Sequence, residues 1–181
     1  MHNCIAMFRG INVSGHKTIK MEQLRNSFLD LGFRNVRTYV QSGNVVFETG
    51  EAVEALSAKI DKKIRDDCGF EAPVTVKSVE ELADIVKRNP FVSDKKVDQT
   101  KLHVTFLLAD PPKNALQLLQ PLAATSERIS IVGRQVYLYC PNGYGRTKLN
   151  NTAIEKKLTC AATTRNWNTT KALLEMAEAS A

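Results

Sequence analysis

The chain has 181 residues, of which 43% are hydrophobic and 24% are charged, and its formal net charge is +6. This length suits one compact domain or two small ones that share a core, and the composition is ordinary for a globular protein. No stretch approaches the roughly 20 apolar residues that a membrane-spanning helix needs. The segment 1–10 lacks the basic leader and long apolar run of a signal peptide. We therefore expect a cytosolic protein with no membrane partner.

Cysteine and histidine are too scattered to indicate a metal site or a disulfide framework. The 4 cysteines lie far apart without a C-x-x-C pair, and the chain has only 3 histidines. We predict reduced thiols, no metal and no cofactor. The positive charge favours an anionic partner or nucleic acid only mildly, because Lys and Arg are dispersed along the chain.

Hydrophobic spacing predicts a β-α-β-β-α-β order in the first part of the chain, which is the order of a ferredoxin-like unit. The predicted elements are a strand over 3–9, a helix from near Met21 to Gly32, strands over 35–40 and 45–48 with a turn at 42–44, a helix from Val53 to Gly69 and a strand over 73–77.

A capping box, Ser78-x-x-Glu81, predicts a linking helix that ends at Pro90. A second set of elements follows: a strand over 102–109, a helix after Pro112, strands over 128–132 and 135–140, a helix capped by Asn150 or by a Thr152-x-x-Glu155 box, and a final helix that begins near Asn168. The order β-α-β-β-α therefore occurs twice.

We predict an α+β fold with two ferredoxin-like halves packed into one unit, each with an antiparallel sheet and helices. The predicted divisions are a first half over 1–78, a linking helix and loop over 79–100, and a second half over 101–181 with an extra C-terminal helix. Each half by itself would have a thin core, which favours packing of one half on the other.

Three polar loops are candidates for ligand binding. The loop 10–18 nearly spells a Walker phosphate loop, but His16 separates Gly15 from Lys17, so we do not expect an NTPase site. Such a loop before a helix can still bind an anion through backbone N–H groups, and a plain connector is the alternative. The turn 41–44 and the glycine-containing loop 141–149 are also candidates for binding a ligand. The alternative for the turn is that its Gly and Asn serve only the turn conformation, and the alternative for the loop is a flexible surface loop.

The octet 163–170 holds the only Trp of the chain, Trp167, together with Arg165 and otherwise only Asn and Thr. A guanidinium fork, amides and an indole can hold a phosphate, a carboxylate or a planar ring. The octet contains no nucleophile, base or metal ligand, and elsewhere no nucleophile is paired with a base. We therefore assign no catalytic residue, and whether the protein is an enzyme stays open. Asn168 or Thr169 is expected to cap the last helix.

Single-stranded RNA binding on a sheet face is a second hypothesis, because RNA-recognition folds of this strand order stack bases on exposed aromatics. Phe8 and Phe47 occupy the first and third predicted strands, but the basic-Gly-aromatic motif around them is incomplete. Core packing of both rings is the alternative.

Three segments, Phe8 to His16, Tyr39 to Phe47 and Ala162 to Thr169, resemble the motifs of the bacterial family DUF1697, and Lys148-Leu149-Asn150-Asn151 is similar to that family's loop before its penultimate helix. The resemblance spans essentially the whole chain and implies an α+β fold of two ferredoxin-like halves. It implies no catalytic residue.

The shared motifs coincide with the polar loops above. We predict that these side chains bind a small anionic or nucleotide-like ligand in a polar cleft between the halves: Arg9, Asn12, Lys17, Gln41, Asn44, Lys148, Arg165, Trp167 and Asn168. Two alternatives stay open. The set around Arg9, Gln41 and Arg165 could instead lock the halves together through buried hydrogen bonds, and the protein could be an interaction module with no small ligand.

Overall fold

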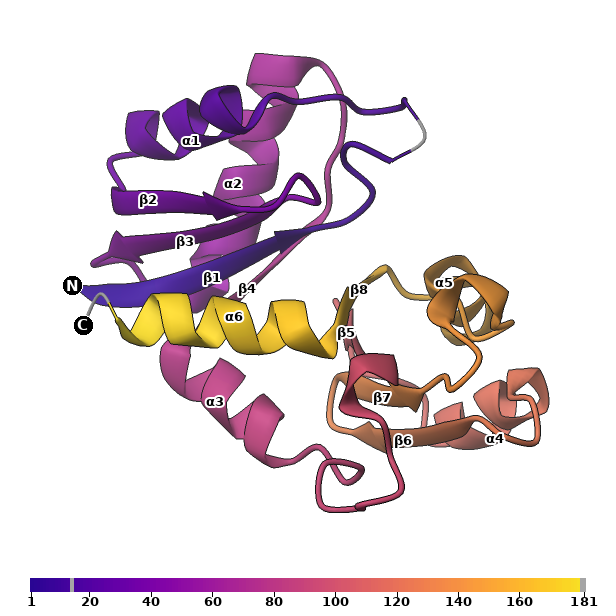
Figure 1. Cartoon of the computed structure of the whole chain (residues 1–181). Coiled ribbons are helices and arrows are strands. Elements are labelled where there is room, and N and C mark those ends of the chain that lie inside the picture. Colours follow the sequence, from indigo (N-terminus) through magenta and orange to yellow (C-terminus); the bar gives the residue numbers. More distant parts are fainter. Residues whose placement is uncertain (14, 180–181) are drawn as a thin grey trace. The chain divides into compact units, whose positions relative to one another are not determined.

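The computed structural model describes residues 1–13 and 15–179 (Figure 1). Ser14, in the loop 10–18, lies outside the described residues. The chain divides into two compact units. The first unit comprises Met1–Asp84 and the chain from Ala172 onward, and the second unit comprises Ile85–Lys171.

The elements of the described chain follow the predicted order closely. The first unit contains β1 (His2–Phe8), α1 (Met21–Asp30), β2 (Arg34–Tyr39), β3 (Asn44–Thr49), α2 (Val53–Cys68) and β4 (Val74–Ser78). The second contains β5 (Leu102–Leu107), α4 (Ala115–Leu119), β6 (Arg128–Val132), β7 (Gln135–Tyr139), α5 (Asn151–Leu158) and β8 (Ala162–Asn166), with short 3-10 turns between them. Two further helices, α3 (Val79–Lys87) and α6 (Trp167–Glu178), each begin in one unit and end in the other.

Each unit is built on a four-stranded antiparallel sheet, with the order β2-β3-β1-β4 in the first unit and β6-β7-β5-β8 in the second. In both sheets the first and third strands of the unit are central, and the second and last strands form the edges. The predicted α+β class and the duplicated βαββ arrangement are therefore confirmed. The sequence prediction missed β8, the strand that completes the second copy.

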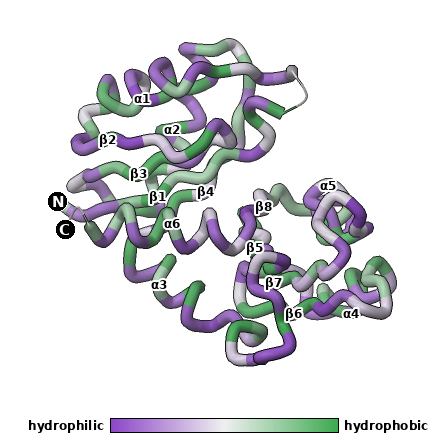
Figure 2. Tube along the Cα trace, viewed as in Figure 1, coloured by the Kyte–Doolittle hydropathy of each residue, from purple (hydrophilic) through white to green (hydrophobic). Residues whose placement is uncertain are grey.

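The first unit buries both faces of its sheet. Successive residues of β1 point to opposite faces, and on one face Phe8 and Phe47 pack against Phe28 of α1, with ring centroids 6.2 and 5.1 Å from that of Phe28. The opposite face carries Asn3, whose Nδ2 donates to the carbonyl oxygen of Ala177 in α6 at 2.8 Å. Figure 2 shows hydrophilic and hydrophobic residues alternating along α1, the pattern of a helix with one buried side.

The second unit also has distinct sheet faces. On one face, Leu107, Val136 and Leu138 belong to a buried cluster that includes residues of α4 and α5. On the other face Val104 lies between its cross-strand partners Tyr137 and Arg165. The hydroxyl of Tyr137 donates to the carbonyl oxygen of Ile85 at 2.7 Å.

The predicted caps Ser78 and Asn150 are confirmed, whereas the predicted Thr152-x-x-Glu155 box and the predicted cap of the last helix are wrong. Ser78 and Glu81 form the predicted capping box, with bonds of 2.9 and 3.2 Å. Asn150, not Thr152, caps α5, because its Oδ1 accepts from the N–H of Ala153 and Thr152 lies inside the helix.

Glu155 accordingly forms no capping box with Thr152 and accepts instead from the N–H of Ala162, at the start of β8. The last helix is capped by Asn166, whose Oδ1 accepts from the N–H of Thr169, so neither Asn168 nor Thr169 is the cap.

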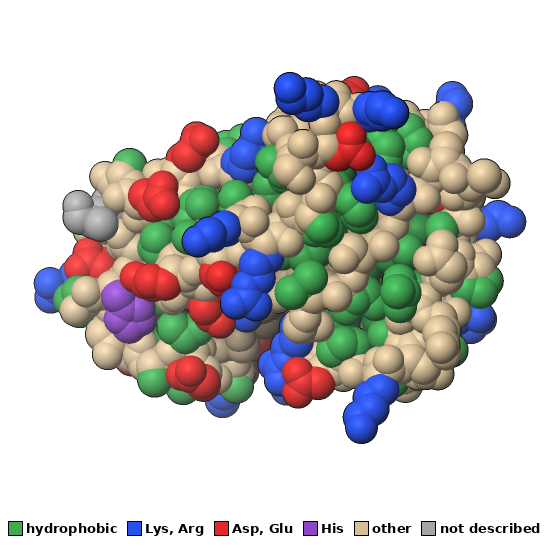
Figure 3. Space-filling view, turned by 90° about the horizontal axis from the view of Figure 1, so that it is seen from below, with side chains coloured by type: hydrophobic (Ala, Val, Ile, Leu, Met, Phe, Trp, Pro, Cys, Tyr) green, Lys and Arg blue, Asp and Glu red, His purple; other side chains and the backbone are tan. Residues whose placement is uncertain are grey.

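Among the described residues, the helices are all too short or too polar to cross a bilayer. The same residues contain no group of three or more His, Cys, Asp or Glu side chains placed to hold a metal ion. On the face shown in Figure 3, Lys and Arg side chains are dispersed among acidic and apolar ones rather than gathered in one patch.

Candidate functional site

Two loops of the first unit are joined by the side chain of Asn12. Its Nδ2 donates to the carbonyl oxygens of Ile19 and Gln41, each at 2.9 Å, and its Oδ1 accepts from the N–H of Ile19 at 2.8 Å. Asn12 itself has φ +55°, a left-handed conformation that Asn tolerates better than most residues. Asn12 thus holds the loop after β1 against the β2–β3 turn.

The β2–β3 turn approaches that loop very closely at Gly43. Gly43 has φ +75°, and a Cβ on it would lie 2.4 Å from Cδ1 of Ile11 and 2.9 Å from Cβ of Phe8. Its carbonyl oxygen accepts from the N–H of Phe8 at 2.9 Å. In the same turn Val40 has φ +49° and is 52% exposed. A β-branched residue in this conformation is strained, and such strain persists only where the surroundings hold it in place.

The other predicted ligand residues of the first unit have different surroundings. Asn44 is fully buried, and its Nδ2 donates to the carbonyl oxygen of Tyr39 and to Oγ of Ser42, both at 3.0 Å. The Nζ of Lys17 donates to the carbonyl oxygen of Glu71 at 2.6 Å. Gln41 is exposed and Arg9 is half-buried. Asn12 and Asn44 are therefore engaged in shaping the loops, which leaves Gln41 as the exposed amide.

In the second unit Arg165 lies on the sheet face that also carries Val104 and Tyr137. Arg165 is only 7% exposed, and its Nη1 donates to Oγ1 of Thr163 at 2.6 Å and to the carbonyl oxygen of Thr164 at 3.0 Å. Its cross-strand neighbour Val104 is fully buried. Desolvation by burial lowers the pKa of Arg165 to about 10. A guanidinium is costly to bury, and the hydrogen bonds to Thr163 and Thr164 offset part of that cost.

Trp167 follows two residues later, as the first residue of α6. Its side chain is 1% exposed, and Nε1 finds no hydrogen-bond acceptor among the described residues. A buried donor that lacks an acceptor costs about 1–3 kcal/mol, and such groups are few in folded proteins. Asn168 beside it is exposed, as is Lys148 in the loop before α5.

A polar network near the same strands was not anticipated from the sequence. Oγ1 of Thr105 lies 2.8 Å from Oγ1 of Thr164, which in turn donates to Oδ1 of Asn151 at 2.9 Å. Next to Thr105 on the same face, the ring of His103 stacks on Tyr144, with centroids 4.5 Å apart. Desolvation lowers the pKa of His103, so the ring is neutral near pH 7. One sequence feature could have indicated this network: His103 and Thr105 are two residues apart in a predicted strand and therefore share a face of the sheet.

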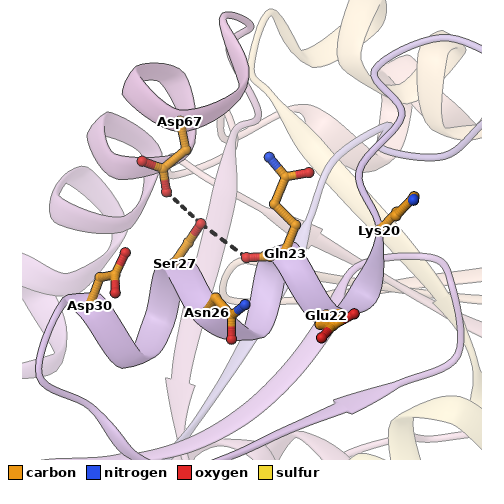
Figure 4. A pocket seen from close by; sticks show the side chains of 7 residues that line it. All are labelled: Lys20, Glu22, Gln23, Asn26, Ser27, Asp30 and Asp67. Atoms are coloured by element: carbon orange, nitrogen blue, oxygen red, sulfur yellow. Dashed lines mark hydrogen bonds between the residues drawn. The ribbon is translucent and has the colours of Figure 1, made fainter.

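A shallow pocket of about 430 Å³ lies between α1 and α2 in the first unit (Figure 4). Its lining residues are polar or charged: Lys20, Glu22, Gln23, Asn26, Ser27, Asp30 and Asp67. Oγ of Ser27 hydrogen-bonds to Oδ2 of Asp67 at 2.5 Å and to the carbonyl oxygen of Gln23 at 3.2 Å. Lys63 bridges Asp67 and Asp30. Ser27, Asp67 and Asp30 are therefore hydrogen-bonded or ion-paired within the protein. We interpret the pocket as part of the contact between the two helices.

The structure groups the nine predicted ligand residues into two sets. Asn12 and Gln41 meet in the first unit, in the loops that also carry Arg9, Lys17 and Asn44. Arg165, Trp167 and Asn168 share the β8–α6 junction of the second unit, and Lys148 lies in the separate loop before α5. That the two sets bind one ligand stays a prediction.

The fold and these loops define an α+β protein with a duplicated four-stranded unit. The family model described as "Protein of unknown function (DUF1697)" matches residues 1–137, and the chain belongs to this family. A solved structure, that of the conserved bacterial protein SP0830 from Streptococcus pneumoniae, is similar with a TM-score of 0.77 at 20% sequence identity, over 97% of this chain and 98% of that one. At this identity the likeness shows the fold alone. The search of curated proteins found no match.

Proposed function

We propose that this protein binds a small anionic or nucleotide-like ligand at the β8–α6 junction of its second unit. The observation that carries the proposal is the buried N–H of Trp167, which has no acceptor among the described residues and stands two positions from the buried Arg165. A phosphate or carboxylate oxygen supplies the acceptor that the indole lacks, and a guanidinium is a donor suited to the same kind of anion. Asn168, at the same junction, is exposed and available for a further polar contact.

The proposal names binding and no reaction. The described residues around this junction are Thr, Asn, Arg and Trp, which donate and accept hydrogen bonds but do not attack or deprotonate a substrate by themselves. RNA binding on the first sheet has lost its main support, because Phe8 and Phe47 are 1% and 0% exposed and pack against α1. Both rings pack in the core, which confirms the alternative given in the sequence analysis.

The single Trp of the chain makes the proposal directly measurable, since all tryptophan fluorescence comes from Trp167. Wild-type protein would be titrated with inorganic phosphate, nucleoside mono- and triphosphates, and phosphorylated sugars, with emission and thermal unfolding recorded together. A ligand at 100 times its Kd stabilises the folded state by about 2.7 kcal/mol. In a chain of this size that corresponds to a rise in Tm of roughly 5–10 °C.

Two variants and a control locate the effect. Trp167→Phe removes the N–H and keeps a ring, so its Tm shift should be smaller than that of the wild type. Arg165→Lys keeps the charge but loses the planar fork, and its Tm shift should fall further. Arg134→Ala removes an exposed guanidinium paired with Asp110 in the same unit and should respond like the wild type. If no probe changes the emission or the Tm of the wild type, the proposal is wrong; equal shifts in all variants would place the ligand elsewhere.

A further inference from the structure

The two units carry opposite formal charges. The second unit, Ile85–Lys171, contains 14 Lys and Arg residues against 5 Asp and Glu, a formal charge of +9. The rest of the chain contains 11 basic residues against 14 acidic ones, a formal charge of −3. The net positive charge of the chain therefore comes entirely from the second unit. Such asymmetry between the parts of a protein is typical of proteins that bind nucleic acids or membranes.

The acidic residues of the second unit are all used within its fold. Their carboxylates pair with arginines or accept from backbone N–H groups: Asp94, Asp98, Asp110, Glu127 and Glu155. From Arg128 to the end of the unit, Glu155 is the single acidic residue. Its Oε1 accepts from the N–H of Ala162, at the start of β8, at 2.9 Å. Acidic side chains therefore neutralise few of the basic ones.

Four exposed cations follow one another closely in this acid-poor part of the chain. They lie in the loop before α5 and on α5 itself (Figure 1), and we call them the basic ridge: Arg146, Lys148, Lys156 and Lys157. In the loop, the buried residues Thr147 and Leu149 alternate with the two exposed cations. On α5, Ile154 and Leu158 are buried, and the two lysines are exposed. The apolar residues thus fix the backbone, and the cations face solvent.

The backbone beneath the ridge is held by hydrogen bonds of its own. Oγ1 of Thr147 accepts from the N–H of Leu149 at 3.0 Å, and Oδ1 of Asn150 accepts from the N–H of Ala153 at 3.0 Å. Within the part of the chain that the structure describes, the four basic side chains form no ion pair and no side-chain hydrogen bond. A bound polyanion therefore displaces no partner and does not have to order this backbone.

The composition of the ridge favours a nucleic acid over an acidic protein or a membrane. Lys is depleted from protein–protein interfaces, which use aromatic and apolar anchors, and the large exposed apolar side chains of the described chain all lie outside 141–161. A helix that binds a membrane surface inserts its apolar face, whereas that face of α5 is buried in the core. Phosphate oxygens accept from Lys, Arg, Asn and Thr side chains, and Asn150 and Thr152 lie exposed between the basic residues.

We infer that the basic ridge binds the sugar–phosphate backbone of a nucleic acid, without preference for base sequence. Each of its four cations contacts a phosphate, and such contacts position the strand but do not read its bases. The inference goes beyond the proposed small-ligand site, because Arg165 and Trp167 are buried and do not belong to the ridge.

The inference is tested by fluorescence anisotropy of the full chain with a labelled single-stranded oligonucleotide of mixed sequence, at increasing salt. Four phosphate contacts give a slope of log K against log salt of about −2.8, so affinity should fall about 50-fold between 50 and 200 mM salt. Lys156→Gln combined with Lys157→Gln removes two contacts, so the slope should halve to about −1.4 and the fall in affinity to about 7-fold. Arg25→Gln neutralises an exposed cation of the first unit and should keep the wild-type slope.

Further measurements separate this inference from the proposed small-ligand site. Trp167→Phe should bind the oligonucleotide like the wild type, and the double Lys variant should keep any Tm shift that a small phosphorylated probe gives the wild type. Because lysines near the end of a helix also favour its dipole, circular dichroism first confirms that each variant is folded.

Two outcomes would overturn the binding itself: no binding of the oligonucleotide at low salt, or a salt slope that the double Lys variant leaves unchanged. Polyglutamate or phosphatidylserine vesicles that bind more tightly than the oligonucleotide at equal salt would overturn the choice of a nucleic acid as the partner.

Discussion

Gly43 gives the sharpest test of how the loops of the first unit are built. Replacing it by Ala introduces a Cβ at 2.4 Å from Cδ1 and 2.7 Å from Cγ1 of Ile11, and at 2.9 Å from Cβ of Phe8. Ile11 and Phe8 are each 1% exposed, so they have little room to withdraw. The left-handed conformation, φ +75°, costs an L-residue about 1–2 kcal/mol. Overpacking of a buried site costs about 1–3 kcal/mol more. We therefore expect Gly43→Ala to lower the free energy of unfolding by about 2–5 kcal/mol.

Gly10→Ala is the matched control, because Gly10 has φ +68° and a Cβ there would meet nothing within 4 Å. It carries the conformational cost without the clash, so it should lose only about 1–2 kcal/mol in urea denaturation followed by circular dichroism. A second test adds Ile11→Ala, which removes the two nearest clashing atoms. The two substitutions should then be less damaging together than the sum of their separate effects. Equal losses for Gly43→Ala and Gly10→Ala would refute the close approach.

Three further predictions concern the first unit. Asn12→Ala removes three hydrogen bonds and places Ala at φ +55°. The free energy of unfolding, measured in urea, should therefore fall by about 2–4 kcal/mol. A fall of less than about 1 kcal/mol would show that Asn12 does not hold the two loops together. Burial raises the pKa of Cys4 to about 12, so iodoacetamide should modify the half-buried Cys160 in the native protein and reach Cys4 only after unfolding, as mass spectrometry can follow. Desolvation raises the pKa of Asp67, but hydrogen bonds from Ser27 and Lys63 lower it by more, and the net pKa is below 3.8. The stabilisation is therefore present above that value and is lost as the pH falls through the lowered pKa, so wild type and Asp67→Asn should differ in stability at neutral pH and converge in strong acid.

Several loop assignments required more than local sequence. Asn150 and Thr152 are both good caps by composition, and only the backbone path shows that the helix begins at Asn151. Glu155 satisfied a capping pattern three residues after Thr152 but instead binds the N–H of Ala162, which is close only because β8 returns to the sheet. Long-range pairing of this kind leaves no local pattern.

β8 is the clearest case. Its residues Ala162–Asn166 are mostly Thr, Arg and Asn, and they do not alternate in hydrophobicity as a half-buried strand does. Thr164 and Arg165 are nevertheless held inside, by Thr105 and Asn151 on one face and by Thr163 beside Val104 on the other. Burial of hydrogen-bonded polar side chains is a tertiary effect, because their partners come from β5 and α5.

By itself, the sequence determined the α+β class, the repeated βαββ order, the core positions of most helices and strands, the family and the loops that carry its motifs. Periodic burial and glycine or proline boundaries are local properties, so they can be read without coordinates. Only the tertiary structure decided which polar side chains are engaged within the fold and which are exposed. Asn12 and Asn44 shape the loops of the first unit, Gln41 is exposed, and Trp167 is buried with a donor that the described residues do not satisfy. These outcomes depend on neighbours distant in the chain, and residue type alone does not specify them.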